Sequence, residues 1–443
     1  MASSSISYSN IWKIALPIII SGLAQNIVTV IDTLFLSQVG VVELGAVGNG
    51  GIFYFLIVTI GLGFTTGTQI LVAKNNGAKN YKEIGTLLEQ SFYFILPLSL
   101  ILFALFQIGY PYLSSLLSKS TAITNASVEF VSYRSFGVLF ALINFLFIAF
   151  FVGIKKTSVL LWSSVVIAVT NITLDYGLIF GNFGLPLFGV KGAAIASVLA
   201  ELSAVIFFVF YSKKQVNLSK YNFRFTFQLK TKLIKDTLRL SSPIMLQNIL
   251  TFGSWFVFFS IIEQIGEDEL AISHVIRSIY MIMMIPLLGF STAIGSLVSN
   301  LLGEGKQEFI LKLLTRTLLL TLVSSSVVVL LTTVFKTQIV GFYQLSAHLE
   351  VGTFATLKVV SFSLFFFSIA FVLFNAIVGL GKTKESLVIE TVNIALYLAT
   401  AIIWVRYYSP SVDQIWYTEF VYFSSLALMS FLYLRFGNWK KEV

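Results

Sequence analysis

The sequence predicts an all-α integral membrane protein with twelve transmembrane helices, arranged as two parallel-repeat six-helix bundles. Three observations lead to this fold class. The 443 residues are 57% hydrophobic and only 11% charged, with a mean hydropathy of +0.89. Long apolar runs recur along the whole chain, and the second half repeats the first at one constant offset that places Pro17 on Pro243.

The composition excludes a water-soluble globular protein, because so few charged residues cannot cover the surface of a folded chain. The apolar runs then decide the kind of spanning element. A hydrocarbon core ~30 Å thick needs about 20 apolar residues per helix, and no run alternates as a β-barrel strand does. We predict helical spans over residues 13–38, 46–73, 86–108, 128–151, 158–180, 192–211, 240–264, 271–301, 314–335, 354–380, 386–406 and 416–436.

The internal repeat predicts the domain organisation. The same offset also matches Gln38 with Gln264, Gly63 with Gly289, Thr66 with Thr292, and Gly153 with Gly379, and we call such pairs repeat-equivalent. Six helices per copy is an even number, so both copies enter the membrane in the same direction. We expect an N-terminal six-helix bundle with the cation site (1–211), a basic cytoplasmic linker (212–239) and a C-terminal six-helix bundle (240–443).

The net charge of +9 arises from basic residues that gather in every second loop, whereas the intervening loop 266–270 is acidic. Basic residues in alternate loops indicate how the chain is oriented in the membrane, so the positive charge gives no reason to expect a nucleic-acid partner. The positive-inside rule predicts a multi-pass protein of the cell (plasma or inner) membrane with both termini cytoplasmic. The first apolar run has no basic region before it, so we expect no cleaved signal peptide.

The residue inventory excludes several chemistries. With no cysteine there can be no disulfide, thiol nucleophile or thiolate metal site. His274 and His348 are the two histidines, too few for a histidine-rich metal site. These absences leave carboxylate chemistry open as a rival; our expectation is a protein that is not an enzyme and has no cofactor.

The two copies differ at a few polar positions, and such differences point to function because shared positions are chiefly those that the fold requires. Three polar residues of the first copy meet apolar or aromatic residues in the second: Asp32 meets Phe258, Asn171 meets Tyr397, and Asp175 meets Ala401. We therefore expect the ion chemistry in the first bundle and an apolar, aromatic wall in the second.

Asp32 and Asp175 each lie about six residues, or ~9 Å, from the outer end of a predicted span. Asn171 precedes Asp175 by one helical turn and lies on the same face, so its amide and the carboxylate can converge. An ionised side chain at the bilayer centre costs at least ~2.5 kcal/mol, which makes a pair without a purpose unexpected. The alternative is that the two acids are interfacial caps or extend to the membrane surface.

Other polar residues in the spans leave alternatives open. Glu201 is either a second proton carrier or a hydrogen-bonded structural glutamate. Glu390 lies about a turn from cytoplasmic lysines, which favours a local salt bridge. His274, Arg277 and Lys358 are each either a gate or substrate contact, or a partner of acids in the loops.

Three stretches of the chain resemble one family in their motifs. They are NITLD from Asn171 to Asp175, the following GNFGLPLFGVKGAAIAS that ends at Ser197, and VIDTLFLSQVG from Val30 to Gly40. They are similar to the fifth and sixth helices and to the first helix of the multidrug and toxic compound extrusion (MATE) family. The loops GAKN (77–80) and GEGK (303–306) are similar to the family's cytoplasmic loops, so the resemblance covers essentially the whole chain.

The resemblance implies a cation-coupled antiporter that works by alternating access. An inward gradient of H⁺ or Na⁺ would drive the export of drug-like, cationic amphipathic compounds. Asp32, Asn171 and Asp175 match the family's amino-terminal cation site, and would be metal ligands only if the coupling ion is Na⁺. Ser197 is the nearest match to a hydroxyl that completes the site. Some members use an acid in helix seven, where this chain has Thr251, so we expect no coupling site in the second bundle. The expected partners are a small-molecule substrate and the lipid bilayer, with the chain a monomer.

Three rival functions remain. A lipid-linked oligosaccharide or polysaccharide flippase of the same superfamily would also be helical and duplicated, but such proteins usually have fourteen spans and basic cavities. An intramembrane aspartyl enzyme needs two carboxylates that share a proton within a few ångströms. A channel or receptor is the third rival, and it would be distinguished by whether flux saturates and is coupled to an ion gradient.

Overall fold

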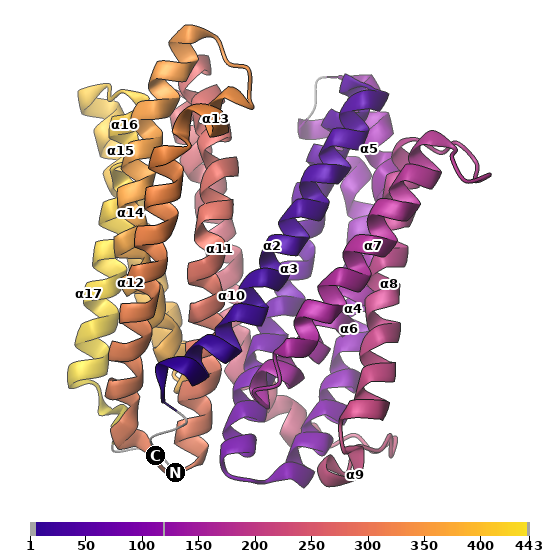
Figure 1. Cartoon of the computed structure of the whole chain (residues 1–443), viewed down its shortest axis with the longest axis vertical. Coiled ribbons are helices and arrows are strands. Elements are labelled where there is room, and N and C mark those ends of the chain that lie inside the picture. Colours follow the sequence, from indigo (N-terminus) through magenta and orange to yellow (C-terminus); the bar gives the residue numbers. More distant parts are fainter. Residues whose placement is uncertain (1–5, 118–119, 441–443) are drawn as a thin grey trace. The chain divides into compact units, whose positions relative to one another are not determined.

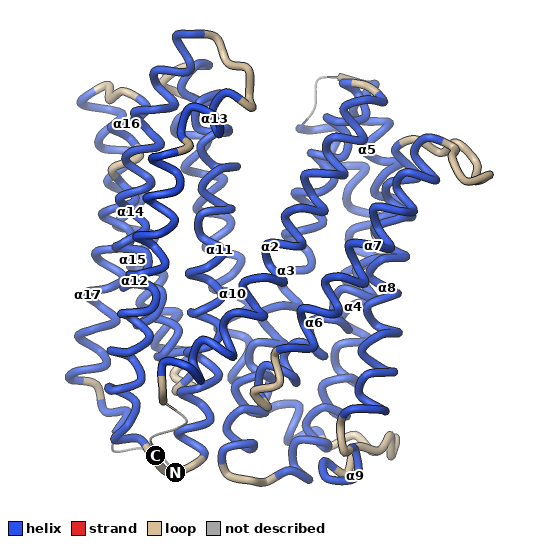
Figure 2. The backbone as a smooth tube through the Cα atoms, in the orientation of Figure 1, coloured by secondary structure: helices blue, strands red, loops and turns tan. Residues whose placement is uncertain are grey.

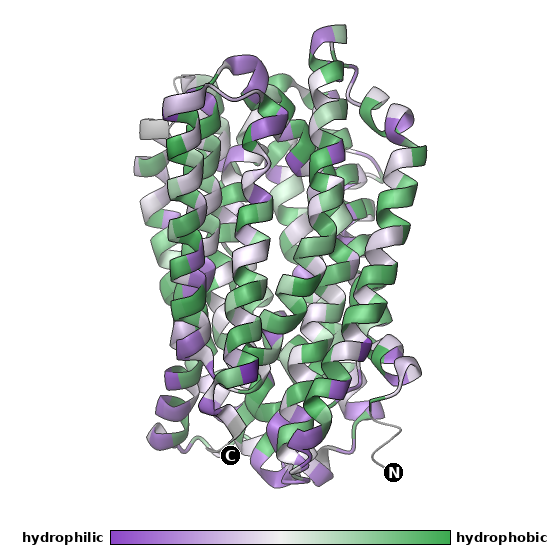
Figure 3. Cartoon of the chain, turned by 90° about the vertical axis from the view of Figure 1, so that its left-hand side faces the viewer, coloured by the Kyte–Doolittle hydropathy of each residue, from purple (hydrophilic) through white to green (hydrophobic). Residues whose placement is uncertain are grey.

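The computed structural model describes residues 6–117 and 120–440 of the chain. Within these residues all regular structure is helical, with no strand (Figures 1 and 2). Among the described residues, eleven helices are long and apolar enough to cross a membrane, and a bent pair of helices, counted as one span, makes twelve. Apolar residues run along the helices and hydrophilic ones gather toward their ends (Figure 3). The prediction of an all-α membrane protein with two sets of six spans is confirmed.

The helices follow the repeat closely. In the first half they are α2 (Tyr8–Val39), α3 (Val41–Gly77), α4 (Tyr81–Leu117), α5 (Thr121–Arg134), α6 (Gly137–Gly153), α7 (Ser158–Phe180), α8 (Val190–Gln215) and the short α9 (Leu218–Tyr221). In the second half they are α10 (Thr231–Glu263), α11 (Glu267–Gly303), η1 (Gln307–Phe309), α12 (Ile310–Val334), α13 (Lys336–Gly341), α14 (Ala347–Gly379), α15 (Thr383–Tyr408), α16 (Val412–Ile415), α17 (Thr418–Phe436) and η2 (Asn438–Lys440). Helices α3 and α11 begin and end at repeat-equivalent positions.

The chain forms two compact units whose boundaries also follow the repeat. The first-half unit contains Ile20–Met245, and the second-half unit contains the chain from Leu246 together with the residues up to Ile19. Ile20 and Leu246, where the two units begin along the chain, are repeat-equivalent. These units differ from the divisions 1–211, 212–239 and 240–443 expected from the sequence. The two boundaries between the observed units each fall inside a helix rather than in a loop: the first lies in α2 and the second in α10.

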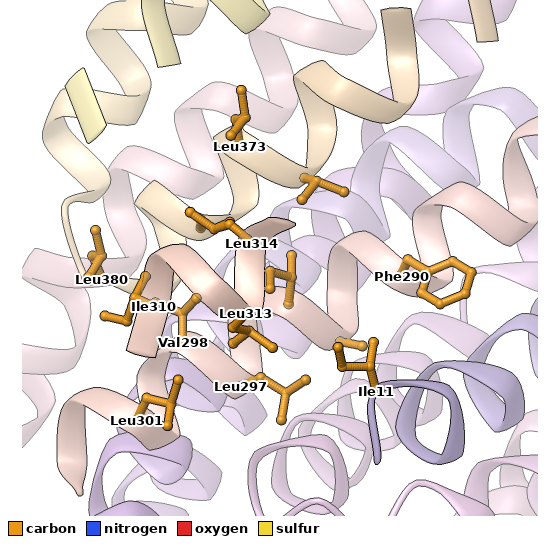
Figure 4. Close-up of a cluster of buried hydrophobic side chains, with 14 of the residues drawn as sticks. Ile11, Phe290, Leu297, Val298, Leu301, Ile310, Leu313, Leu314, Leu373 and Leu380 are labelled. Atoms are coloured by element: carbon orange, nitrogen blue, oxygen red, sulfur yellow. The ribbon is translucent and has the colours of Figure 1, made fainter. Parts of the chain in front are cut away.

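The start of α2 belongs to the second-half unit because its apolar side chains are part of that unit's core. Figure 4 shows this cluster, in which Ile11 of α2 accompanies residues of α11, α12 and α14. The indole ring of Trp12 lies 5.4 Å from the ring of Phe290, and the Arg316 guanidinium donates to the carbonyl of Ile6 at 2.8 Å. Close van der Waals packing of this kind is what holds helices together in lipid.

The segment after α9 is fixed to the first-half unit through α4. Gln90 brackets it, since its side-chain amide donates to the Gln228 carbonyl at 2.8 Å and its oxygen accepts from the Lys230 amide at 2.7 Å. The Glu89 carboxylate accepts from the amide of Thr226 at 2.6 Å. The basic stretch that the sequence predicted as a linker is therefore hydrogen-bonded to α4 along part of its length.

The span formed by α5 and α6 is bent in the first half only. α5 and α6 meet at a bend of 50°, whereas α14, their counterpart, is continuous. At the bend the amide of Phe136 bonds to Tyr133 and that of Val138 to Ser135, which is the three-residue spacing of a tighter turn. The Ser135 hydroxyl donates instead to the Gln107 side chain of α4 at 2.6 Å. A side-chain contact and a tighter turn thus accompany the bend.

Candidate functional site

Helices α2 and α7 of the first-half unit bring three of the predicted site residues together. Asp175 and Asn171 lie on one face of α7 and are almost completely buried, with exposures of 0% and 2%. Asp32 of α2 is half-buried, and its carboxyl group is near enough to the Asp175 carboxyl group for the two to interact electrostatically. The structure thus places these three side chains near one another, while the binding of a cation by them stays a prediction.

Four oxygen atoms at this place have no hydrogen-bond partner among the described residues. They are Oδ1 of Asp32, Oδ1 of Asn171 and both carboxylate oxygens of Asp175. The amide nitrogen of Asn171 donates to the Ser197 hydroxyl of α8 at 3.5 Å, so the predicted hydroxyl also lies at the site. Oxygen donors of this kind suit hard cations, and two facing carboxyl groups suit a proton.

Among the described residues, no third His, Cys, Asp or Glu side chain joins Asp32 and Asp175 to form a metal site. In the part of the chain that the structure describes, no group of three or more His, Cys, Asp or Glu side chains is placed to hold a metal ion. Two carboxylates, an amide oxygen and a hydroxyl remain, a set that fits a monovalent cation or a proton better than a tightly held divalent metal.

An aromatic group packs beside the acid pair. The Phe35 ring, about one turn after Asp32, meets the Phe180 ring edge-on with centroids 5.5 Å apart, and the Tyr176 ring lies 6.3 Å from Phe35. Tyr176 in turn packs against Phe183, at 5.5 Å. These rings join α2 to α7 toward the ends of the two helices, beyond the carboxyl groups.

Glu201 belongs to another cluster of the same unit. Its carboxylate forms a two-pronged ion pair with Arg134 of α5, with contacts of 2.6 and 3.0 Å, and it accepts from the Tyr54 hydroxyl at 2.8 Å. The guanidinium also lies 3.5 Å from the centroid of the Tyr54 ring. Glu201 is therefore hydrogen-bonded throughout, and the structure does not bring it to Asp175.

Arg134 and Glu201 meet where α6 begins, and a glycine leaves room for them. A Cβ atom on Gly137 would lie 2.0 Å from the Arg134 guanidinium and 2.4 Å from the Glu201 carboxylate. Asp32 is near enough to Arg134 for their charges to interact. The sequence analysis missed Arg134, although a basic residue inside the predicted span 128–151 was a signal for it.

The repeat-equivalent positions of the second-half unit are filled by packing. Phe258, Tyr397 and Ala401 are all buried, with exposures of 2%, 2% and 0%. The rings of Phe258 and Tyr397 lie 5.3 Å apart, and the Trp416 ring meets Phe258 edge-on at 5.5 Å. An aromatic contact thus replaces the acid pair, in agreement with the aromatic wall expected there.

Two buried acids occur elsewhere in the second-half unit. Glu390 accepts hydrogen bonds from Thr251 of α10, at 3.0 Å, and from Tyr422 of α17. The predicted salt bridge between Glu390 and nearby lysines is therefore wrong. Glu419 accepts from Tyr280 and Tyr397, each at 3.3 Å. The sequence analysis missed Glu419 because it stands near the start of a span, where an acid usually faces water.

The other polar candidates of the second half lie apart from these acids. The His274 ring stacks on Phe259 with centroids 5.1 Å apart, and the Arg277 guanidinium lies 5.2 Å from the same ring. The Lys358 side chain is exposed. The structure therefore places these three side chains at neither group of buried carboxylates.

Comparisons with known proteins agree with this architecture. The profile of the MatE family matches residues 17–177 and 243–403, two segments that begin and end at repeat-equivalent positions. A relative from Thermotoga maritima, named "Probable multidrug resistance protein NorM", is 23% identical over 97% of this chain and 92% of that protein.

Two solved structures show the same fold. A MOP superfamily transporter from Pyrococcus furiosus Vc1 (DSM3638) has a TM-score of 0.89 at 19% identity, over 98% of this chain and 96% of that chain. A multidrug resistance MATE family transporter in an outward-facing conformation has a TM-score of 0.88 at 21% identity, over 98% and 97%. The family profile covers most of the chain, and its two matches follow the observed repeat. The chain therefore belongs to the MatE family of multi-pass membrane transporters, which move small molecules and are not enzymes.

Proposed function

We propose that this transporter is a cation-coupled antiporter that exports drug-like, cationic amphipathic small molecules by alternating access, driven by an inward gradient of H⁺ or Na⁺. The observation that supports it best is the meeting of the Asp32 and Asp175 carboxyl groups, with the Asn171 amide beside them. The four residues of the site all come from one chain, so a monomer suffices.

The acid pair is suited to coupling because its energy depends on what it binds. Two carboxylates that face each other in a medium of low dielectric repel strongly when both are ionised. A proton or a sodium ion between them removes that repulsion, and its departure restores it. Since Asp32 stands on α2 and Asp175 on α7, the occupancy of the site changes the force between these two helices. A cation that binds one arrangement of the helices better shifts the population toward it.

Export of drug-like compounds is supported by the relatives rather than by a pocket. The Thermotoga maritima relative, which this chain matches over nearly its whole length, is named a probable multidrug resistance protein. Cationic substrates fit the same scheme, because an inward cation gradient can be exchanged for an outward-moving organic cation. A flippase for lipid-linked oligosaccharides is the less favoured function, since such proteins usually have fourteen spans and the described part of this chain has twelve when the bent pair counts as one.

Asp175→Asn tests the proposal, because it keeps the size of the side chain but removes its charge and its titration. Purified wild-type and variant proteins are reconstituted in liposomes, and efflux of a fluorescent cationic dye is recorded under separately imposed pH and sodium gradients. We expect gradient-driven flux to be lost in Asp175→Asn, while thermal melting stays close to that of the wild type. The gradient that drives the wild-type protein identifies the coupling ion.

Asp236→Asn is the matched control, because the same chemical change is made at an exposed aspartate of α10. It should transport as the wild type does. Coupled flux at the wild-type level from a correctly folded Asp175→Asn protein would overturn the proposal.

A further inference from the structure

Glu390 of α15 is a buried carboxylate whose two oxygens have different surroundings. The side chain is 2% exposed. Its Oε1 accepts from the hydroxyl groups of Thr251 and Tyr422, while Oε2 is buried without a hydrogen-bond partner. Both donors are neutral, so no positive charge compensates an ionised Glu390.

Asn393, one turn further along the same face of α15, has the same kind of unsatisfied atom. It is 0% exposed, its Oδ1 accepts from the Ser425 hydroxyl, and its Nδ2 is buried without a partner. A buried polar atom without a partner costs free energy, and two in neighbouring side chains call for an explanation. Of the two, only Oε2 of Glu390 is an acceptor, so it is the atom to which a proton can add.

Tyr422 links Glu390 to the second buried acid of the unit. The Tyr422 ring lies 5.4 Å from that of Tyr397, whose hydroxyl donates to Glu419, and Tyr422 is also within electrostatic range of Glu419. Tyr280 donates to the other oxygen of Glu419. These five residues form a buried group that we name the tyrosine–carboxyl cluster.

The groups that face Glu390 include no cation. On α10 the facing group is Thr251, while Gln247, one turn before it, accepts from Ser386 of α15, and neither of the two titrates. On α17 they are Tyr422 and, beyond it, Glu419. No described charged residue of α14 or α16, the other helices packed against α15, acts on Glu390. The contrast is with Glu201, which Arg134 neutralises.

The repeat shows that the acid is specific to this unit. The counterpart of Glu390 in the first-half unit is Ser164, whose hydroxyl contacts that of Ser21. Conversely, the counterpart of Asp175 is Ala401, roughly three turns after Glu390 in α15. Each unit thus has a buried carboxylate on the fifth helix of its repeat, at different depths.

We propose that Glu390 is a second proton-binding group of this transporter, which exchanges its proton during the transport cycle. The proposal deepens the antiport described above and rests on it. It departs from the expectation of no coupling site in the second bundle, because the acid stands on α15 and the residue at the expected position, Thr251, is its hydrogen-bond donor. One proton from water adds to Oε2 and gives the neutral acid, and its return to water restores the carboxylate. A metal ion fits less well, because Thr251 and Tyr422 already donate their hydroxyl protons to Glu390 and the free atom of Asn393 is a donor.

Infrared difference spectra recorded across a pH range test the proposal directly, because a neutral carboxyl group shows its own carbonyl stretch. We expect Glu390→Gln to lose one titrating carboxyl band. Glu385→Gln, the matched control on the same helix outside the cluster, should keep it. Tyr422→Phe should keep the band but move it to higher frequency, since the carbonyl loses a donor. An unchanged set of bands in Glu390→Gln would overturn the proposal.

Flux measurements separate this inference from the proposed function. Glu390→Gln should lower pH-gradient-driven dye efflux between roughly 5- and 150-fold, the usual range of a coupling between sites, with unchanged melting. The Glu390 band should persist in Asp175→Asn. If Asp175→Asn keeps coupled flux, the proposed function fails. If Asp175→Asn loses flux while Glu390→Gln transports as the wild type does, only the role of Glu390 fails.

Discussion

The first-half unit pairs its largely buried Glu201 with a cation, whereas the second-half unit surrounds Glu390 and Glu419 with neutral hydroxyl groups. The spans follow the same order in both units, but the side chains around the acids differ, and so does the backbone at Arg134, where α5 and α6 meet at a bend that α14 lacks. A carboxylate with a fixed guanidinium partner stays ionised and acts as a structural tie. One held only by hydroxyl groups can be stable in either protonation state. Within one fold, the partner of each acid therefore decides whether it can take part in ion exchange.

The largest expected effect comes from removing the cation. Arg134→Gln leaves the Glu201 carboxylate without its counter-charge and should cost about 3 kcal/mol of unfolding free energy. The double variant Arg134→Gln/Glu201→Gln should recover much of that loss, because no uncompensated charge remains. Melting of the purified proteins in detergent measures both.

Glu390→Gln serves as the opposite arm of this comparison, since it removes a buried acid that has no cation. Its melting temperature should stay at or above that of the wild type. Two results would contradict the distinction between an acid paired with a cation and one held by neutral donors. Either Arg134→Gln would melt like the wild type, or the melting temperature of Glu390→Gln would fall as far as we expect for Arg134→Gln.

A smaller effect should separate two equivalent glycines. A Cβ on Gly379 would lie 2.5 Å from the backbone oxygen of Gly295, whereas one on Gly153 would meet the Val72 side chain at 2.6 Å. Backbone cannot move aside as a side chain can, so Gly379→Ala should lose about 2 kcal/mol, and more than Gly153→Ala. The readout is the difference in melting temperature between the two alanine variants. Equal losses would mean that α14 shifts as easily as α6 does.

The smallest effect concerns two equivalent loops. Lys79 has a positive φ of 61°, and its counterpart Gly305 has one of 69°. Glycine adopts this left-handed conformation without steric cost, so Lys79→Gly should stabilise the protein by roughly 0.5 kcal/mol after its greater backbone entropy is counted. Gly305→Lys should destabilise the protein by a similar amount. No atom crowds that position, so the left-handed backbone conformation is the only cost of the larger residue. Lys79→Gln is the control, because it removes the charge but keeps a side chain. If Lys79→Gln and Lys79→Gly melt at the same temperature, the conformational explanation is contradicted.

Much of the fold could be predicted because it depends on local chemistry. Apolar runs of fixed length give the spans, and the constant offset between the two halves gives the repeat. The meeting of Asn171 and Asp175 follows from their spacing on one helix, and that of Asp32 from its equal depth. The proximity is observed, while the roles of these residues in ion binding stay a prediction.

The contacts that the sequence did not predict join helices far apart in the chain. Arg134 and Glu201 stand on α5 and α8, and Glu390 meets side chains of α10 and α17. Hydropathy gives the depth of a residue but not the direction in which its helix presents it. That direction is set by packing against neighbours, so Glu390 was assigned to the nearest lysines in sequence when its partners lie on other helices.

The placement of the start of α2 in the second-half unit has a consequence for the order of events during synthesis. Ile6, Ile11 and Ile14 are made long before their packing partners on α11, α12 and α14, which belong to the second half of the chain. At about 5–20 residues per second, this delay is on the order of tens of seconds. The rest of α2 can meet α7 of its own unit much earlier. Helix α2 therefore has to be held at its leading end, by lipid or by the insertion machinery, until the second half of the chain arrives.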